Sequence, residues 1–178
     1  KLKDETYEAT FVLGYKGYIQ LAIRSGYYKT INVSDVRDGE FKHYNALTDE
    51  IEIEVIQDET ARLKAPVIGY YAYLRLTNGF EKAMYWSYEK MLDHADKYSA
   101  AVSAEAYANI RAGKVPEKDM WKYSSFWYKS FDQMAMKTML RQLISKWGIM
   151  SIDMQTAYEY EVKAEEETLK SQPPISII

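Results

Sequence analysis

The sequence contains no cysteine and only two histidines among 178 residues, which excludes several kinds of functional site. Without cysteine there is no disulfide framework, no thiolate zinc site and no cysteine nucleophile. Two histidines leave few groups for acid–base catalysis, and no Ser–His–Asp order is apparent. The Gly-x-x-x-x-Gly-Lys-Ser/Thr spacing of a nucleotide-binding loop is also absent. We therefore expect no catalytic residue, no bound metal and no cofactor.

Long apolar segments are missing as well. Every apolar run is short and interrupted by charge, so none could span a bilayer, and the first residues do not resemble a secretion signal. We therefore expect a soluble, intracellular protein with no membrane partner. The 47% of hydrophobic residues suffice for the core of one domain over residues 1–178. Because the sequence begins at Lys1 in the middle of a pattern, we expect the natural start to be missing.

Neither sign of charge is in large excess, but the charges are unevenly distributed. A net charge of -3 and an isoelectric point near 5.5 argue, at face value, against nucleic-acid binding. However, acidic residues gather in residues 49–59 and 159–167, whereas Asp132 is the single acid between Trp121 and Trp147. The cations in that interval are Lys122, Lys129, Lys137, Arg141 and Lys146. A basic face on an acidic protein can still bind phosphate.

Hydrophobic patterns and turn residues predict an α+β fold, in which an antiparallel β-sheet with hairpins packs against helices. Hairpin turns are predicted at Asp38-Gly39 and, most clearly, at Asn78-Gly79. Strands are predicted over residues 6–13, 30–44, 51–55, 67–77 and 80–86, and a helix over residues 15–24.

The second half of the chain has helical patterns. A helix is predicted from an N-cap at Ser87 through Met91, and another over residues 153–170, before the prolines that follow. Over residues 99–118 only weak secondary structure is predicted, and part of this segment is expected to be a mobile loop. The long helix of this half is predicted over residues 125–147. Its apolar positions at spacings of four are Phe131, Ala135, Met139, Leu143 and Trp147.

Two groups of residues could bind phosphate. Lys129, Gln133, Lys137 and Arg141 are each four apart and form a polar stripe on the long helix. Spacing alone favours an ordinary solvated face, but the stripe lacks the acids that such faces usually include. The second group is a turn at Gly14–Gly17, which places Lys16 at the start of a helix, where free backbone N–H groups favour anions. The two glycines can equally well be explained by a tight turn between a strand and a helix. Arg24 lies about two helical turns beyond Lys16 and could share its face.

Carboxylate clusters give only weak signals for an enzyme. The first cluster is Asp93, His94 and Asp96, but the side chains of neighbouring residues diverge around a helix. The second cluster is Asp35, Asp38 and Glu40, and acids in a hairpin turn need no catalytic explanation.

The run LGYKGYIQLAIRSG, followed by INVSDVRDGEFKHYN, resembles the GY(K/R)G–LA–R(S/T)G segment of the RecT family of phage single-strand annealing proteins. The run FWYKSFDQMAMKTMLRQLISKWG is similar to the W–(E/Q)MA–KT–R–L–K helix of that family, and a hairpin segment similar to IGYYAYLRLTNGFEKAMYW lies between them. The resemblance extends from about Phe11 to Glu161 and is sparse between Ala100 and Lys122. Two separated motifs in the correct order are more specific than either alone. One departure is Met139, where the family often has alanine.

The resemblance implies a protein without bond chemistry, which binds single-stranded DNA and anneals complementary strands without ATP during phage homologous recombination. It implies an annealing-protein core distantly like the eukaryotic ring-forming annealing proteins, and homo-oligomers in rings or helical filaments. The implied partners are DNA, the annealed duplex intermediate, a phage exonuclease and a host single-strand-binding protein in the bacterial cytoplasm. The family's N-terminal helical region and C-terminal tail are expected to lie outside this sequence, and the resemblance leaves open whether Mg²⁺ assists annealing.

Matching motif positions gives the residues that this resemblance implies for DNA binding. Trp127 could instead belong to the core, and core packing also accounts for most of the 17 tyrosines. The implied backbone contacts are Lys16, Arg24, Lys137, Arg141 and Lys146, and the implied stacking or groove-wall residues are Tyr15, Tyr18 and Trp127.

Two alternatives remain open from the sequence. One is a metal-dependent DNA-processing nuclease that uses the acidic clusters, and the other is a structural protein that self-associates through its tyrosine-rich sheet. DNA cleavage that EDTA abolishes would favour the nuclease. Oligomers that form normally but do not bind DNA would favour the structural protein.

Overall fold

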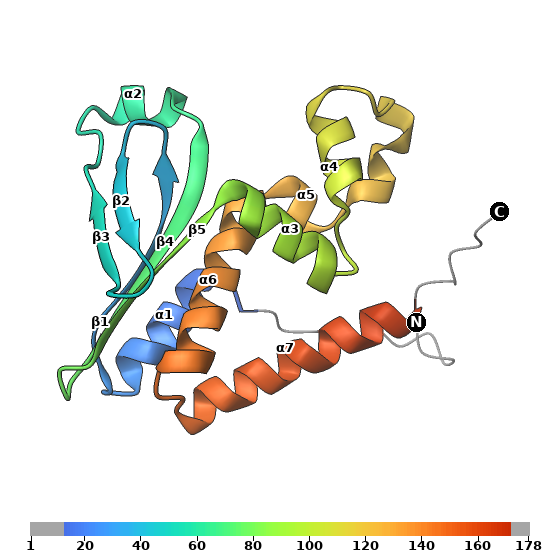
Figure 1. Ribbon diagram of the computed structural model, residues 1–178. Helices are drawn as coiled ribbons and strands as arrows, with labels where there is room; N and C mark the ends of the chain where they lie inside the picture. The colour runs from blue at the N-terminus through green and yellow to red at the C-terminus, as the bar shows by residue number, and fades with distance from the viewer. Residues whose placement is uncertain (1–12, 172–178) are drawn as a thin grey trace.

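The computed structural model describes the backbone of residues 13–171 and the side chains of residues 13–164 (Figure 1). The fold is α+β, as the sequence predicts, with antiparallel sheets packed against helices. The strand predicted over residues 6–13 lies almost entirely outside the described residues. Within the described part of the chain, no helix is long and apolar enough to cross a membrane.

A three-stranded antiparallel sheet forms the centre of the molecule. Its strands are β1 (Tyr28–Arg37), β4 (Val67–Leu76) and β5 (Glu81–Ser87), in the order β1-β4-β5. The hairpin predicted at Asn78-Gly79 is confirmed: β4 pairs with β5, and Gly79 has φ +92°, a conformation that glycine adopts without steric cost. Tyr70, Ala72, Leu74 and Leu76 alternate along β4 and are buried. The side chains on this face of β4 supply the central part of the core.

The hairpin predicted at Asp38-Gly39 is wrong, although the chain does turn there. Gly39 has φ +89°, but β1 pairs with β4, whereas β2 (Phe41–Asn45) pairs with β3 (Glu50–Ile53) in a separate two-stranded sheet. This small sheet covers the face of the central sheet opposite the helices, where Phe41 stacks on Tyr85 with ring centroids 4.5 Å apart. Pairing with apolar β4 buries more of β1 than pairing with polar β2 could. The turn residues therefore determine where the chain bends, but not which strand pairs with β1.

A short helix, α2 (Glu59–Lys64), follows the small sheet and was missing from the sequence analysis. Its N-cap is Asp58, whose carboxylate accepts hydrogen bonds from the N–H groups of Thr60 and Ala61. In the sequence, Asp58 and Glu59 belong to an acidic block, which hides the capping signal.

Three helices cover the other face of the central sheet: α1 (Tyr15–Arg24), α3 (Tyr88–Tyr98) and α6 (Phe131–Trp147). The helix predicted over residues 15–24 is confirmed. The predicted N-cap at Ser87 is also confirmed, since its hydroxyl accepts from the N–H of Lys90 at 3.2 Å. However, α3 continues seven residues past Met91 to Tyr98. Met91 and Ala95 are both buried, and they hold the extended helix on the sheet.

The helix predicted over residues 125–147 is in fact two helices, α5 (Phe126–Lys129) and α6. Ser130, between them, has φ -148° and ψ 57°, which is not helical. The break lets both Trp127 and Phe131 enter the core with ring centroids 5.3 Å apart. The predicted apolar stripe is otherwise buried, except Trp147, which is 44% exposed.

The remaining helices lie around residues 99–118 and at the end of the chain. Weak structure was the wrong prediction for part of residues 99–118, because α4 (Ala104–Arg111) forms there with Ser103 as its N-cap. A 3₁₀-helix, η1 (Glu117–Tyr123), follows. The helix predicted over residues 153–170 is confirmed as α7 (Ile152–Ser171), which extends along one side of the molecule (Figure 1).

Candidate functional site

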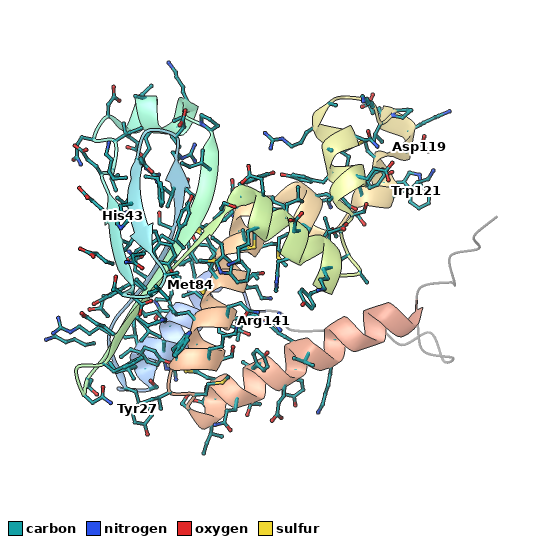
Figure 2. All side chains as sticks on the ribbon, in the orientation of Figure 1. Tyr27, His43, Met84, Asp119, Trp121 and Arg141 are labelled. Carbon is teal, nitrogen blue, oxygen red and sulfur yellow. The ribbon has the colours of Figure 1, made fainter. Side chains whose placement is uncertain are left out.

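A cleft of about 760 Å³ lies between α3, the α5–α6 segment and α7. Figure 2 shows Arg141, one of the lining residues, on α6. Half of the lining side chains are basic or aromatic: Trp86, Lys90, His94, Tyr98, Phe126, Trp127, Lys137, Arg141, Lys146 and Tyr158. Among the described residues that line the cleft, Glu161 is the one acidic side chain.

Burial and neighbouring cations act on the pKa of His94, which lines the cleft. Burial lowers it, and the nearby charges of Lys146, Arg141 and Lys90 lower it further, in that order. The imidazole is therefore neutral at neutral pH and presents an uncharged aromatic ring to the cleft. Three cations within reach of one ring form the kind of charge cluster that attracts a polyanion.

Aromatic rings form a series along the α3 side of the cleft. The His94 ring lies 5.0 Å from that of Trp86 and 4.7 Å from that of Tyr98, measured between centroids. Lys90 Nζ lies 4.8 Å from the Trp86 ring. Tyr98 is 65% exposed, and Phe126 on the α5 side is 70% exposed, so both rings are accessible to a ligand. Exposed aromatic planes interleaved with cations are typical of sites for single-stranded nucleic acids.

A buried ion pair closes the cleft on the α7 side. Lys137 Nζ lies 2.9 Å from Glu161 Oε1, and both side chains are almost completely buried. The Tyr18 hydroxyl donates to Glu161 Oε2 at 2.6 Å, and Arg141 Nε lies 3.9 Å from the same oxygen. Burial and the hydrogen bond to Glu161 raise the pKa of Tyr18 well above its usual range, so the hydroxyl remains a donor. The Arg141 guanidinium lies 5.0 Å from the Tyr158 ring on α7.

The structure brings together four of the residues that the sequence analysis named: Trp127, Lys137, Arg141 and Lys146 line the cleft. Tyr18 is buried and reaches it through Glu161. Of the other named residues, all of which the structure describes, none lines this cleft. They are Tyr15, Lys16 and Arg24 on α1, Lys129 on α5 and Gln133 on α6.

The predicted polar stripe on the long helix is not continuous. Lys129 lies on the separate helix α5, beyond the break at Ser130, and Lys137 is 5% exposed rather than on a solvated face. The stripe therefore does not present four successive contacts to one phosphate backbone. Whether Lys129 and Gln133 contact DNA stays a prediction.

The sequence analysis missed half of the cleft. Lys90, His94 and Tyr98 are four residues apart and form one helix face, but α3 was predicted only as far as Met91. His94 was considered with Asp93 and Asp96 as a weak metal cluster. In the structure, Asp96 instead accepts a hydrogen bond from the N–H of Ala104 at 2.7 Å. No group of three or more His, Asp or Glu side chains in the described part of the chain is placed to hold a metal ion.

The second carboxylate cluster belongs to a structural ion-pair network between the two sheets and α2. Glu40 is fully buried and accepts from Arg62 Nε at 2.6 Å. Arg62 also lies 3.4 Å from Asp35, whose other oxygen lies 2.7 Å from Arg37 Nε. Asp38 is exposed in the turn. These contacts explain the acids without a catalytic role.

Comparisons with known proteins agree with the resemblance seen in the motifs. Residues 2–174 match the family model described as the RecT family. The chain is also 41% identical over 150 residues to a Bacillus subtilis (strain 168) protein named "Uncharacterized protein YqaK". That alignment covers 84% of this chain and 44% of the relative. The aligned segment therefore spans less than half the length of this relative.

Proposed function

The chain belongs to the RecT family, and from this premise we propose that it binds single-stranded DNA in the cleft and anneals it to a complementary strand without ATP. The observation that supports the site most directly is the combination of four cations with accessible aromatic rings in one cleft. Lys90, Arg141 and Lys146 would neutralise the phosphates, while Tyr98 and Phe126 would stack on unpaired bases.

Annealing makes and breaks no covalent bond. The protein must lower the repulsion between two phosphate backbones and keep the bases unpaired until complementary contacts form. Backbone and stacking contacts do not depend on sequence, so base pairing itself would supply the specificity. Affinity should therefore fall steeply as the salt concentration rises.

Family membership supports oligomers on single-stranded DNA, and the exonuclease and the single-strand-binding protein are proposed as further partners. We propose that several copies align their clefts along one strand as a ring or helical filament, in the cytoplasm of the bacterial host. A phage exonuclease would supply single strands, and a host single-strand-binding protein would hand them over. The length of the curated relative leaves room for such contacts outside the aligned segment.

The proposal is tested by mixing the protein with a labelled oligonucleotide, adding the complement without ATP, and following duplex formation. The informative variant is Lys90→Ala/Lys146→Ala, because both side chains are exposed and their removal should leave the fold intact. Lys29→Ala/Lys64→Ala is the matched control, since it removes two exposed cations that do not line the cleft. We expect the cleft variant to anneal at least about tenfold more slowly and the control to behave as wild type.

The outcomes separate the alternatives. Normal annealing by the cleft variant would move the DNA site elsewhere, and a folded wild-type protein without annealing or DNA binding would refute the function. Shortening of the oligonucleotide that EDTA abolishes would instead indicate a nuclease, and oligomers that ignore DNA would indicate a structural protein. Repeating the assay with and without Mg²⁺ tests whether the ion assists by screening phosphates.

A further inference from the structure

Three donors from two separate parts of the chain converge on one carboxylate at the edge of the cleft. Tyr18 comes from α1, and Lys137 and Arg141 come from α6, whereas Glu161 comes from α7. Their polar atoms lie 2.6, 2.9 and 3.9 Å from the Glu161 oxygens. A lysine, an arginine and a hydroxyl around a single anion are the donor set that also binds a phosphate oxygen.

The Glu161 carboxylate has side-chain partners on both of its oxygens. Oε2 accepts a hydrogen bond from the Tyr18 hydroxyl, and Oε1 forms an ion pair with Lys137 Nζ at 2.9 Å. Buried polar atoms usually have hydrogen-bond partners, and a buried ion pair is by itself weak evidence of a stabilising role. This carboxylate is therefore a replaceable ligand for the cations around it.

The way in which α7 is attached would allow another anion to replace Glu161. Near its start, Met154 is fully buried, and Glu161 connects α7 to α1 through the Tyr18 hydroxyl. Farther along, Tyr158, Glu161 and Ala164 form one wall of the cleft. Figure 1 shows α7 passing along the side of the helical layer, outside both sheets. A shift of α7 could therefore withdraw Glu161 while the sheet and α6 stay in place.

We propose that Lys137, Arg141 and Tyr18 form a seat for one phosphate of the DNA backbone, and that Glu161 fills this seat until the strand displaces α7. The inference rests on the proposed binding of DNA in the cleft. A phosphodiester carries one negative charge, as does the carboxylate, so the exchange conserves the charge next to Lys137. In the DNA-free protein, α7 thus competes with DNA for the cleft.

The first experiment compares the affinities of Glu161→Gln and Glu159→Gln for a fluorescent oligonucleotide at one salt concentration. Glu159 is an exposed neighbour on α7 outside the cleft lining, so both variants lose one negative charge but only Glu161→Gln removes the anion from the seat. We expect Glu161→Gln to bind about tenfold more tightly than Glu159→Gln. Equal or weaker binding by a folded Glu161→Gln protein would overturn the inference. Failure of the wild type to bind would instead refute the proposed function.

The second experiment does not depend on the stability of Glu161→Gln. Because the chain has no cysteine, Ala164→Cys introduces one thiol on the α7 wall of the cleft, and Leu47→Cys introduces a reference thiol at a 95% exposed site between β2 and β3. We expect the oligonucleotide to speed maleimide labelling at position 164 and to leave position 47 unchanged. Slower or unchanged labelling at position 164, with DNA bound, would show that α7 stays in place and would overturn the inference.

Discussion

Glu40 and Glu161 are both buried glutamates beside basic side chains, but their surroundings differ. Glu40 accepts from the N–H of Arg37 at 2.8 Å, from the N–H of Ile56 at 3.1 Å and from Arg62 Nε at 2.6 Å. Both of its oxygens therefore have donors. Glu161 accepts from the Tyr18 hydroxyl on one oxygen, and its other oxygen lies 2.9 Å from Lys137 Nζ, so these partners are side chains.

This difference separates a structural carboxylate from an exchangeable one. Glu40 ties together β1, the small sheet and α2, and its donors include backbone groups that cannot turn away without unfolding. Two side chains on α6 and one on α1 surround Glu161, and all three can pair with another anion. A buried carboxylate that accepts hydrogen bonds from backbone N–H groups therefore stabilises the fold, and burial alone does not identify such a carboxylate.

The strongest test of the comparison is Glu40→Ala. The substitution leaves the Arg62 guanidinium and two backbone N–H groups without their acceptor, so we expect the free energy of unfolding to fall by about 3 kcal/mol. Chemical denaturation measures this change. Asp38→Ala, which removes an exposed acid from the same turn, should change it by less than about 0.5 kcal/mol. Similar losses for the two variants would show that the network around Glu40 contributes little.

Lys137→Met tests the other carboxylate. Glu161 would lose its nearest cation while remaining buried, and we expect the free energy of unfolding to fall by about 2 kcal/mol. The double variant Lys137→Met/Glu161→Gln should recover most of this stability, because no unpaired charge remains. DNA affinity should stay low in both variants, since each lacks the Lys137 cation. Recovered DNA binding in the double variant would exclude Lys137 as a phosphate contact.

Tyr98→Ala should separate binding from stability. The ring is 65% exposed, so we expect little change in unfolding, whereas loss of one stacking surface should weaken DNA binding about tenfold. Fluorescence anisotropy with a labelled oligonucleotide gives the affinity. Tyr160→Ala is the control, because Tyr160 is 66% exposed on α7 and does not line the cleft. Equal effects of the two substitutions would argue against stacking on Tyr98.

Acid should weaken the Glu40 network by a smaller amount. Burial alone would raise the pKa of Glu40, but Arg62 and the N–H groups of Arg37 and Ile56 hold it below its ordinary value. A lowered folded-state pKa gives stability that is present above the unfolded value of about 4.3 and is lost as the pH falls through the folded value. Between about pH 5 and pH 3, we expect the free energy of unfolding of Glu40→Gln to fall by about 1 kcal/mol less than that of the wild type. Parallel pH profiles in denaturant titrations would contradict this account.

The sequence predicted the parts of the fold that local chemistry determines. The helix at residues 15–24, the Asn78-Gly79 hairpin and the Ser87 cap all depend on residues close together in the chain, and all are confirmed. The partner of β1 depends instead on which strand buries more apolar surface, and Asp38-Gly39 contains no information about that. The break at Ser130 likewise follows from the joint packing of Trp127 and Phe131, which helical spacing cannot reveal.

The candidate site was only partly predictable for a similar reason. Motifs and charge counts identified Lys137, Arg141 and Lys146 on one helix, but the opposite wall lies on α3, which ends 39 residues before Lys137. Glu161 belongs to an acidic segment that composition assigns to solvent. Only its position against Tyr18 and Lys137 distinguishes it from the exposed Glu159 on the same helix.

Because α7 is long, a small tilt of the helix about its start would move Glu161 by several ångströms. Glu161 lies seven residues beyond the buried Met154, a separation of roughly 10 Å along the helix axis. If Met154 acts as the fulcrum, a tilt of roughly 20° moves the carboxylate by roughly 3.5 Å, which exceeds the present gap to Lys137. The core around Met154 need hardly move during this rotation. Opening the cleft in this way would break the contacts of Glu161 with Lys137 and Tyr18 and leave the packing around Met154 in place.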